Sequence, residues 1–280
     1  MMTLMGRQNG PLAYTMPVFV RAREYHLYDR QGRRYIDFFQ NHGRAILGHR
    51  PDGMLRAIKA TASRGLIAEY PSVYQGRLEK ILEQLLPGPF TVRYYSDLRY
   101  VREMLQRALG LSDAPLVIAD PALADPTPDD AVSFWRPFLE DVELLAKVFI
   151  PILPFPGNFV PEIVCVRDGS LAKELPPSDP VSPLLLDLLV KSAAGLIGVS
   201  EEKRKRNSSR NPLAEVFPTI RGPYCVTGLS EERYRVFYDA AMAAGVVLPP
   251  GPEFPVISPR WYDQGEIEPL IRLARQSAGT

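Results

Sequence analysis

Cysteine, histidine and lysine are scarce in this chain. Only Cys165 and Cys225 occur, each in an apolar run typical of a strand, so we expect two buried thiols rather than a disulfide. With 3 histidines and no Cys-x-x-Cys pair, the sequence predicts no metal site. The chain therefore has few groups suited to metal binding or nucleophilic catalysis.

Net charge and long hydrophobic runs are also lacking. The 33 basic and 32 acidic residues nearly cancel, which leaves no global field to attract nucleic acid or an anionic membrane. The apolar runs are short and interrupted by proline, so none is expected to span a bilayer. No charged and then apolar leader opens the chain. We therefore expect a cytoplasmic protein with neither a nucleic-acid nor a membrane partner.

Proline, in contrast, is abundant, with 28 residues, about twice its usual frequency. The prolines cluster in 115–137, 151–161 and 176–183, which are predicted to connect regular elements. We divide the chain into an N-terminal arm with a β-meander (1–50), a reduced large domain (51–200) and a C-terminal α+β small domain (201–280).

Apolar periodicity predicts the elements within these regions. A helix that follows Pro51-Asp52 has one apolar face formed by Met54, Leu55, Ile58 and Ala62. Another helix is predicted over 131–147, broken near Pro137. Continuous apolar runs predict strands over 148–153 and 162–166, covered on both faces. Further helices are predicted over 74–86, 98–109, 184–194, 231–244 and 265–277.

The most informative stretch covers 25–49 and reads YHLYDRQGRRYIDFFQNHGRAILGH. Two β-prone runs flank the polar turn at Asp29-Arg30-Gln31-Gly32, which predicts a short antiparallel pair. Later motifs are Arg221-Gly222 and the stretch 244–254, AGVVLPPGPEF. Together these motifs resemble those of class III aminotransferases, pyridoxal-phosphate enzymes of fold type I. The resemblance is nearest to the glutamate-1-semialdehyde aminomutase branch.

The resemblance implies an α/β protein of truncated fold-type-I architecture, in which a reduced central sheet joins the α+β small domain. It also implies that "S-G-x-E-A" at a helix N-terminus holds the cofactor phosphate. The aligned residues here are Ser96-Asp97-Leu98-Arg99-Tyr100. A carboxylate replaces the glycine, so we expect Asp97 to oppose phosphate binding.

Three further parts that the resemblance implies are missing. The family's aromatic-His-Gly segment has its counterpart in 117–121, which contains no aromatic residue and no histidine. No Asp-Glu dipeptide, whose aspartate would contact the pyridinium nitrogen, occurs in the chain. No lysine directly precedes 156–161, the counterpart of the glycine-rich loop. Lys147 and Lys173 flank this region and remain as candidates.

These losses favour a non-catalytic, aminotransferase-like homodimer that binds no cofactor and serves assembly or regulation, with the segment 25–49 contributing to assembly. One alternative is an active pyridoxal-phosphate aminotransferase or aminomutase that uses Lys147 or Lys173, with Arg221 or Arg260 binding a substrate carboxylate. Another is a non-catalytic subunit of a full-length homologue or of another enzyme.

The resemblance also places Asn41 and His42 near the substrate side of the cleft, where a small-ligand pocket could persist. Arg221 is the third candidate for substrate contact, although a salt bridge at a strand end is the alternative reading of its position.

Overall fold

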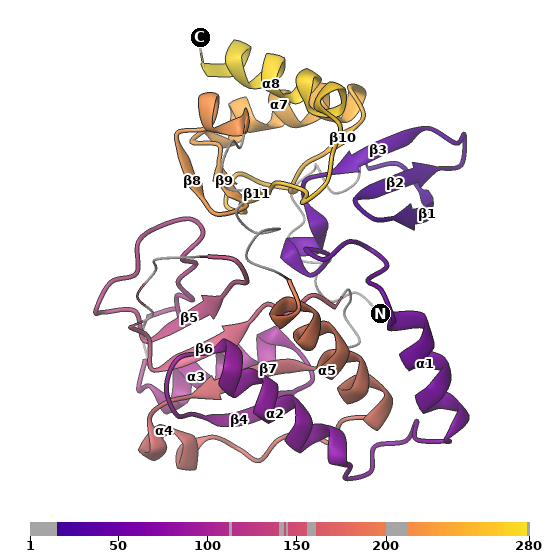
Figure 1. Ribbon diagram of the computed structural model, residues 1–280. Helices are drawn as coiled ribbons and strands as arrows, with labels where there is room; N and C mark the ends of the chain where they lie inside the picture. Colours follow the sequence, from indigo (N-terminus) through magenta and orange to yellow (C-terminus); the bar gives the residue numbers. More distant parts are fainter. Residues whose placement is uncertain are drawn as a thin grey trace. The chain divides into compact units, whose positions relative to one another are not determined.

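The computed structural model describes residues 16–111, 114–139, 143, 145–155, 161–199 and 212–278 (Figure 1). The chain divides into two compact units. Unit 1 combines 1–51, 138–140 and 199–280, and unit 2 combines 52–137 and 141–198. The first and last parts of the chain therefore fold together. The loop counterpart at 156–160 lies outside the described residues.

Unit 1 contains a four-stranded sheet in the order β1-β2-β3-β10. The predicted meander is confirmed, because its three strands pair antiparallel in sequence order. The Asp29 carboxylate accepts hydrogen bonds from the backbone amides of Gln31 and Arg33, both at 2.9 Å, and thereby fixes the turn. The strands are Phe19–Arg23, His26–Asp29, Arg34–Asp37 and Val246–Val247, the last of which is parallel to β3.

Unit 1 also contains a three-stranded sheet in the order β11-β9-β8 and two helices, α7 and α8, that pack against each other. Ser230 is the N-cap of α7, and its hydroxyl accepts a hydrogen bond from the Arg233 amide. Aromatic and aliphatic side chains of both helices and of β3 share one core. The bounds are β8 Thr219–Arg221, β9 Tyr224–Val226, β11 Val256–Ile257, α7 Glu231–Ala243, α8 Gln264–Ala278 and the 3-10 helix η3 Pro212–Glu215.

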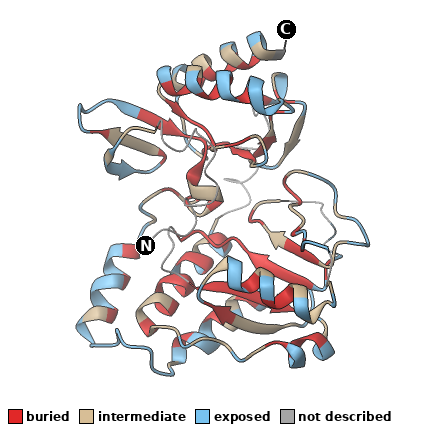
Figure 2. Cartoon of the chain, turned by 180° about the vertical axis from the view of Figure 1, so that it is seen from behind, coloured by how far each residue is buried: buried red, intermediate tan, exposed pale blue. Residues whose placement is uncertain are grey.

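Unit 2 contains a four-stranded sheet in the order β4-β7-β6-β5. β7 is antiparallel to both of its neighbours, whereas β6 and β5 are parallel. Every residue of β6 and β7 is buried, as predicted for strands covered on both faces (Figure 2). The bounds are β4 Thr91–Tyr95, β5 Val132–Trp135, β6 Val148–Pro151 and β7 Glu162–Val166.

The helices of unit 2 form two groups. α3 and α4 pack on the sheet through a shared apolar core. α1 and α2 both pack against α5, which is buried along most of its length (Figure 1). The bounds are α1 Met54–Ser63, α2 Val73–Leu85, α3 Leu98–Ala108, α4 Gly169–Glu174 and α5 Pro183–Ile197.

Two sequence predictions about unit 2 are wrong. The predicted helix over 131–147 is replaced by β5, because its β-branched and aromatic residues pair with the buried strand β6. In α1, the structure buries Met54, Ala57 and Thr61, whereas Leu55 and Ile58 of the predicted inner face point outward. The inner face is fixed by Thr61, whose hydroxyl donates a hydrogen bond to the buried Asp187 carboxylate of α5 at 2.6 Å.

Candidate functional site

The turn between β4 and α3 is the counterpart of the phosphate-binding turn. A strand, a tight turn and a helix follow one another here, so the first backbone amides of α3 are directed toward the turn. Asp97 is the N-cap, and its carboxylate accepts a hydrogen bond from the Tyr100 amide at 2.8 Å. One amide that could bind an anion therefore already has an anionic partner within the chain.

A second carboxylate lies at the same turn. Asp179 accepts a hydrogen bond from the Ser96 amide at 2.8 Å, and its own amide donates to the Tyr94 carbonyl at 2.8 Å. The hydroxyl of Ser178 accepts a further bond from the Tyr94 amide. The segment around 178–179 therefore lies against the end of β4. A phosphate dianion bound at this turn would meet two carboxylates, so these residues do not fit the phosphate of a pyridoxal cofactor.

The structure places Leu98 and Arg99 in the first turn of α3. Arg99 is exposed and Leu98 half-buried. Leu98 packs against the core that α3 shares with the sheet, so its role is structural. The residues 96–99 therefore span the connection from β4 and the start of α3.

Lys147 and Lys173 lie at the opposite end of the strands of the β4-β7-β6-β5 sheet from the turn at 96–99. Lys147 directly precedes Val148, the first residue of β6. Both Val148 and Thr91, the first residue of β4, pair with Val166 of β7, so β4 and β6 begin at the same end of the sheet. The turn at residues 96–99 follows the other end of β4, about 13 Å away along the strand. Lys173 is in the last turn of α4, which begins just after β7 ends. Both lysine side chains are exposed, and neither is brought to the turn.

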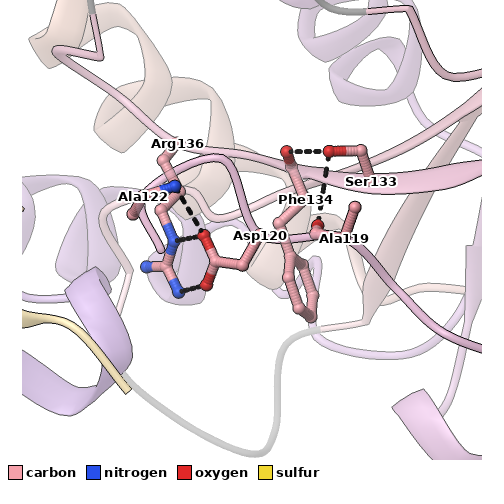
Figure 3. Close-up of polar contacts among 6 residues, drawn as sticks. All are labelled: Ala119, Asp120, Ala122, Ser133, Phe134 and Arg136. Carbon is pink, nitrogen blue, oxygen red and sulfur yellow. Dashed lines mark hydrogen bonds and ion pairs between the residues drawn. The ribbon is translucent and has the colours of Figure 1, made fainter. Parts of the chain in front are cut away.

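A buried ion pair lies at the end of β5. The Arg136 guanidinium donates two hydrogen bonds to the Asp120 carboxylate, at 2.7 and 2.6 Å (Figure 3). The Ala122 amide donates to the same carboxylate at 3.0 Å. The Arg136 side chain is only 3% exposed. This strand end therefore presents a cation held by its own carboxylate.

Asn41 and His42 belong to the 3-10 helix η2 (Gln40–Gly43), which has left-handed backbone angles. The φ angles of Gln40, Asn41 and His42 are 48°, 46° and 60°, a conformation that costs roughly 1–2 kcal/mol for each residue with a side chain. The His42 ring lies edge-on between Phe39 and Phe254, with centroid distances of 4.5 and 4.7 Å. Strained segments of this kind are frequent at ligand sites.

The Asp37 carboxylate holds this strained segment in place. It accepts hydrogen bonds from the Phe39 and Gln40 amides, both at 2.9 Å, and its other oxygen is 2.8 Å from His49 Nε2. His49 is therefore engaged with a buried carboxylate, which the sequence alone did not indicate.

Arg221 lies on the far side of the small sheet from η2. It pairs with Tyr224 of β9, which pairs in turn with Ile257 of β11. Gln40 donates its side-chain amide to the Ile257 carbonyl at 3.0 Å. Two strand spacings, about 10 Å, therefore separate Arg221 from the strand that η2 contacts. Arg260 lies elsewhere in unit 1, 5.5 Å from the centroid of the Phe138 ring.

An open cleft of about 430 Å³ lies between the meander and the start of α8. Within it, the Glu266 carboxylate is 3.0 Å from His26 Nε2 and 2.7 Å from an Arg34 nitrogen. Burial opposes ionisation of Glu266, but a hydrogen bond from the Asp263 amide and these two partners outweigh it and lower the pKa of Glu266. The charges here are mutually compensated.

Metal and membrane sites do not emerge from the described residues. Among them, no group of three histidine, cysteine, aspartate or glutamate side chains is arranged to hold a metal ion. In the same part of the chain, no helix combines the length and hydropathy needed to cross a bilayer.

Aminotransferases of known structure have a similar fold. The chain matches an ornithine aminotransferase of Plasmodium yoelii with a TM-score of 0.64 and 12% identity, over 94% of this chain and 93% of that one. An N-acetylornithine aminotransferase of Stenotrophomonas maltophilia matches with a TM-score of 0.62 and 14% identity, over 95% and 96%. The chain thus has the α/β fold of class III aminotransferases, which confirms the predicted architecture.

No protein-family model matches the chain. Comparison with individual sequences finds higher identities, over shorter stretches, than the structural comparison does. The chain is 32% identical over 82 residues to glutamate-1-semialdehyde 2,1-aminomutase of Aquifex aeolicus, and 30% identical over 105 residues to that of Thermus thermophilus. The predicted resemblance to this branch is therefore confirmed. These matches cover 29% and 37% of this chain but only 19% and 25% of the aminomutases.

Two spirochaete proteins of unassigned function are also similar. One from Borreliella burgdorferi is 49% identical over 67 residues, which span 24% of this chain and 25% of that protein. One from Treponema pallidum is 24% identical over 277 residues, which span 82% of this chain and 85% of that protein. The second similarity extends over most of both chains.

Proposed function

We propose that this protein is an aminotransferase-like protein that does not form an internal aldimine and acts as a dimeric assembly or regulatory protein. The observation that carries the proposal is the pair of carboxylates at the turn before α3. Asp97 and Asp179 accept hydrogen bonds from amides that an anion would need, each at 2.8 Å. A bound phosphate would have to displace both carboxylates and would still meet their negative charges.

Two further arrangements support the loss of cofactor chemistry. A lysine that forms an imine must reach the cofactor. Lys147 and Lys173 are exposed, and they lie at the end of the strands opposite to the turn before α3. The chain also contains no Asp-Glu dipeptide, whose aspartate would contact the pyridinium nitrogen of the cofactor. The chain thus lacks two separate requirements of pyridoxal-phosphate catalysis, a lysine within reach of the cofactor and a carboxylate beside the pyridinium nitrogen.

The direct test is a titration of the purified full chain with pyridoxal phosphate. We expect no stoichiometric long-wavelength imine band and, after borohydride reduction and peptide mapping, no single lysine labelled. A known fold-type-I aminotransferase treated in parallel provides the positive control. A stoichiometric, reducible band on one lysine would refute the proposal.

The labelled position would also separate the alternatives. Label on Lys147 or Lys173 that disappears in a Lys147→Arg or Lys173→Arg variant would establish an active site of altered geometry. Asn41, His42 and Arg221 are our candidates for ligand contact in that case. Within the present proposal, Asn41 and His42 are the candidates for a retained small-ligand pocket, supported by the strained backbone of η2.

A further inference from the structure

The cleft between the meander and the start of α8 is lined by aromatic rings. All of its lining residues belong to unit 1, and among them are Tyr28, Trp261 and Tyr262. Trp261 is 48% exposed, although tryptophan is highly buried on average. The cleft volume of about 430 Å³ lies within the range of about 300–1,000 Å³ for small-molecule sites. An exposed indole in a cleft of this size makes it a candidate binding site.

The α8 side of the cleft is fixed by contacts within the chain. The Asp263 amide donates a hydrogen bond to Glu266 Oε2 at 3.1 Å, and the Glu266 amide donates to the Asp263 carbonyl at 2.9 Å. Tyr262 packs against the core of unit 1. A wall that is fixed in this way lowers the entropy lost when a ligand binds.

The meander side is fixed as well. The Arg21 guanidinium carbon lies 4.3 Å from the centroid of the Tyr28 ring, which holds that ring by a cation–π contact. Glu24, in the turn between β1 and β2, has a left-handed φ of 52°, and its carbonyl accepts a hydrogen bond from the His49 amide at 2.7 Å. Backbone strain of this kind is concentrated at ligand sites and similar functional positions. Both sides of the cleft are therefore formed before a ligand arrives.

The largely buried carboxylate of the cleft is already satisfied. Glu266 Oε1 is 3.0 Å from His26 Nε2 and 2.7 Å from a guanidinium nitrogen of Arg34. The other oxygen, Oε2, accepts the hydrogen bond from the Asp263 amide. Both carboxylate oxygens of Glu266 are thus engaged within the chain, so the recognition of a ligand falls to the more exposed charged groups.

Those exposed groups differ in sign on the two sides of the cleft. In the part of the chain that the structure describes, Arg34 contacts Glu266 through one guanidinium nitrogen only, which leaves its other donors available. Arg23 lies 3.9 Å from Glu24, beyond the length of a hydrogen bond. On the α8 side, Asp263 is exposed, and no cation among the described residues pairs with its carboxylate. A ligand therefore meets guanidinium groups on one side and a carboxylate on the other.

We infer that this cleft binds a small aromatic zwitterion, a planar ring joined to one carboxylate and one ammonium group. The ring stacks on Trp261, the carboxylate accepts hydrogen bonds from Arg23 and Arg34, and the ammonium group donates to Asp263. A ligand with only one charge would leave one side of the cleft unpaired. The inference names a ligand for the proposed regulatory function and rests on that function for its biological role. The cleft contains none of the residues of the turn before α3 and none of the candidates for substrate contact.

The first experiment uses the fluorescence of Trp261. The chain has 2 tryptophans, so the variant Trp135→Phe leaves Trp261 as the only reporter. We expect L-phenylalanine to change its emission saturably, with a dissociation constant below about 1 mM. Phenylpropionate lacks the ammonium group, phenylethylamine lacks the carboxylate and glycine lacks the ring, so each should bind at least about tenfold more weakly. No saturable binding of L-phenylalanine, or equal binding of any one of these three compounds, would overturn the inference.

The second experiment assigns the two charges by isothermal titration calorimetry on the full chain and its variants. Asp263→Asn should weaken the binding of L-phenylalanine about tenfold and leave that of phenylpropionate unchanged, because only the ammonium group loses its partner. Arg23→Gln should weaken the binding of both compounds by similar factors. Asp239→Asn and Arg30→Gln are the matched controls, since both residues are exposed in unit 1 outside the cleft.

Circular dichroism verifies that each variant is folded. A folded Asp263→Asn variant that binds L-phenylalanine as the wild type does contradicts the inference. The same holds if this variant loses affinity for L-phenylalanine and phenylpropionate equally, because the effect would then be structural.

These outcomes are independent of cofactor binding, since neither experiment contains pyridoxal phosphate. A chain that binds L-phenylalanine in this cleft, but forms a reducible imine when pyridoxal phosphate is added, contradicts only the proposed function. A chain that forms no imine and does not bind L-phenylalanine contradicts only the inferred ligand site.

Discussion

Removing the negative charge at the turn before α3 should create a phosphate site. The variant Asp97→Asn with Asp179→Asn keeps the shape of both side chains and their hydrogen bonds to the Ser96 and Tyr100 amides. Asparagine is as good an N-cap as aspartate, so the cost in stability is limited to the interaction with the helix dipole, about 0.3–1 kcal/mol per carboxylate.

The gain in affinity follows from Coulomb's law. Because Ser96 is exposed, water dominates the local dielectric, and two unit charges at 4 Å interact by about 1 kcal/mol. A phosphate dianion therefore loses about 2 kcal/mol to each carboxylate, or about 4 kcal/mol to both. Screening at physiological ionic strength reduces this total, so we expect phosphate to bind on the order of a hundredfold more tightly to the double variant.

Isothermal titration with inorganic phosphate and with pyridoxal phosphate, at two salt concentrations, measures this change. A second variant, Asp97→Gly with Asp179→Ala, also frees the two amides and should bind still more tightly. Asp168→Asn is the control, because Asp168 caps α4 at the other edge of the sheet and accepts hydrogen bonds from two amides there. If the first double variant binds phosphate less than about threefold more tightly than the wild type, the two negative charges are not what prevents phosphate from binding at this turn.

Three further changes test the packing and electrostatics of the two units. Asp120→Asn leaves Arg136 buried without its counter-charge and should lower the free energy of unfolding by about 3–5 kcal/mol in urea, whereas a loss below 1 kcal/mol would show that the pair is dispensable. Gly222→Ala directs a methyl group to 2.3 Å from a backbone carbonyl, and should destabilise by about 3 kcal/mol. Gly32→Ala has a similar positive φ but meets nothing within 4 Å, so it should cost only about 1 kcal/mol; equal losses would contradict this reasoning. The lowered pKa of Glu266 means that its stabilising effect is present above the ordinary glutamate pKa and is lost as pH falls through the lowered value. Glu266→Gln should therefore be less stable than the wild type at neutral pH, by at most about 1 kcal/mol, and equal to it in acid; a gap that widens on acidification would contradict this.

Local patterns in the sequence were sufficient for much of the fold. The run 162–166 is uniformly apolar apart from its first residue, and it forms β7 with the predicted bounds. The prediction failed over 131–147, because the pairing of Val132 with Val148 of β6 decides the conformation there. Such pairing depends on neighbours in space, which a local pattern does not record.

The candidate site, like the fold, could be predicted from the sequence only in part. Asp97 could be identified from the sequence because it replaces one residue of a contiguous motif. Asp179 could not, since it lies 83 residues after Ser96 in sequence, in a proline-rich connection with no motif of its own. The outward position of Leu55 likewise depends on which face of α1 meets α5, and both faces are apolar.

The pairing of β3 with β10 has a consequence for synthesis of the chain. Ile36 and Asp37 form their ladder with Val246 and Val247, so unit 1 joins segments made at very different times on the ribosome. At about 5–20 residues per second, the meander waits roughly 10–40 s after it emerges before its last neighbouring strand exists. During that interval the buried side of β3, with Tyr35 and Ile36, has no C-terminal helices to cover it. The segments 52–137 and 141–198 of unit 2 are complete by then, so unit 2 can fold before the last part of unit 1 has been synthesised.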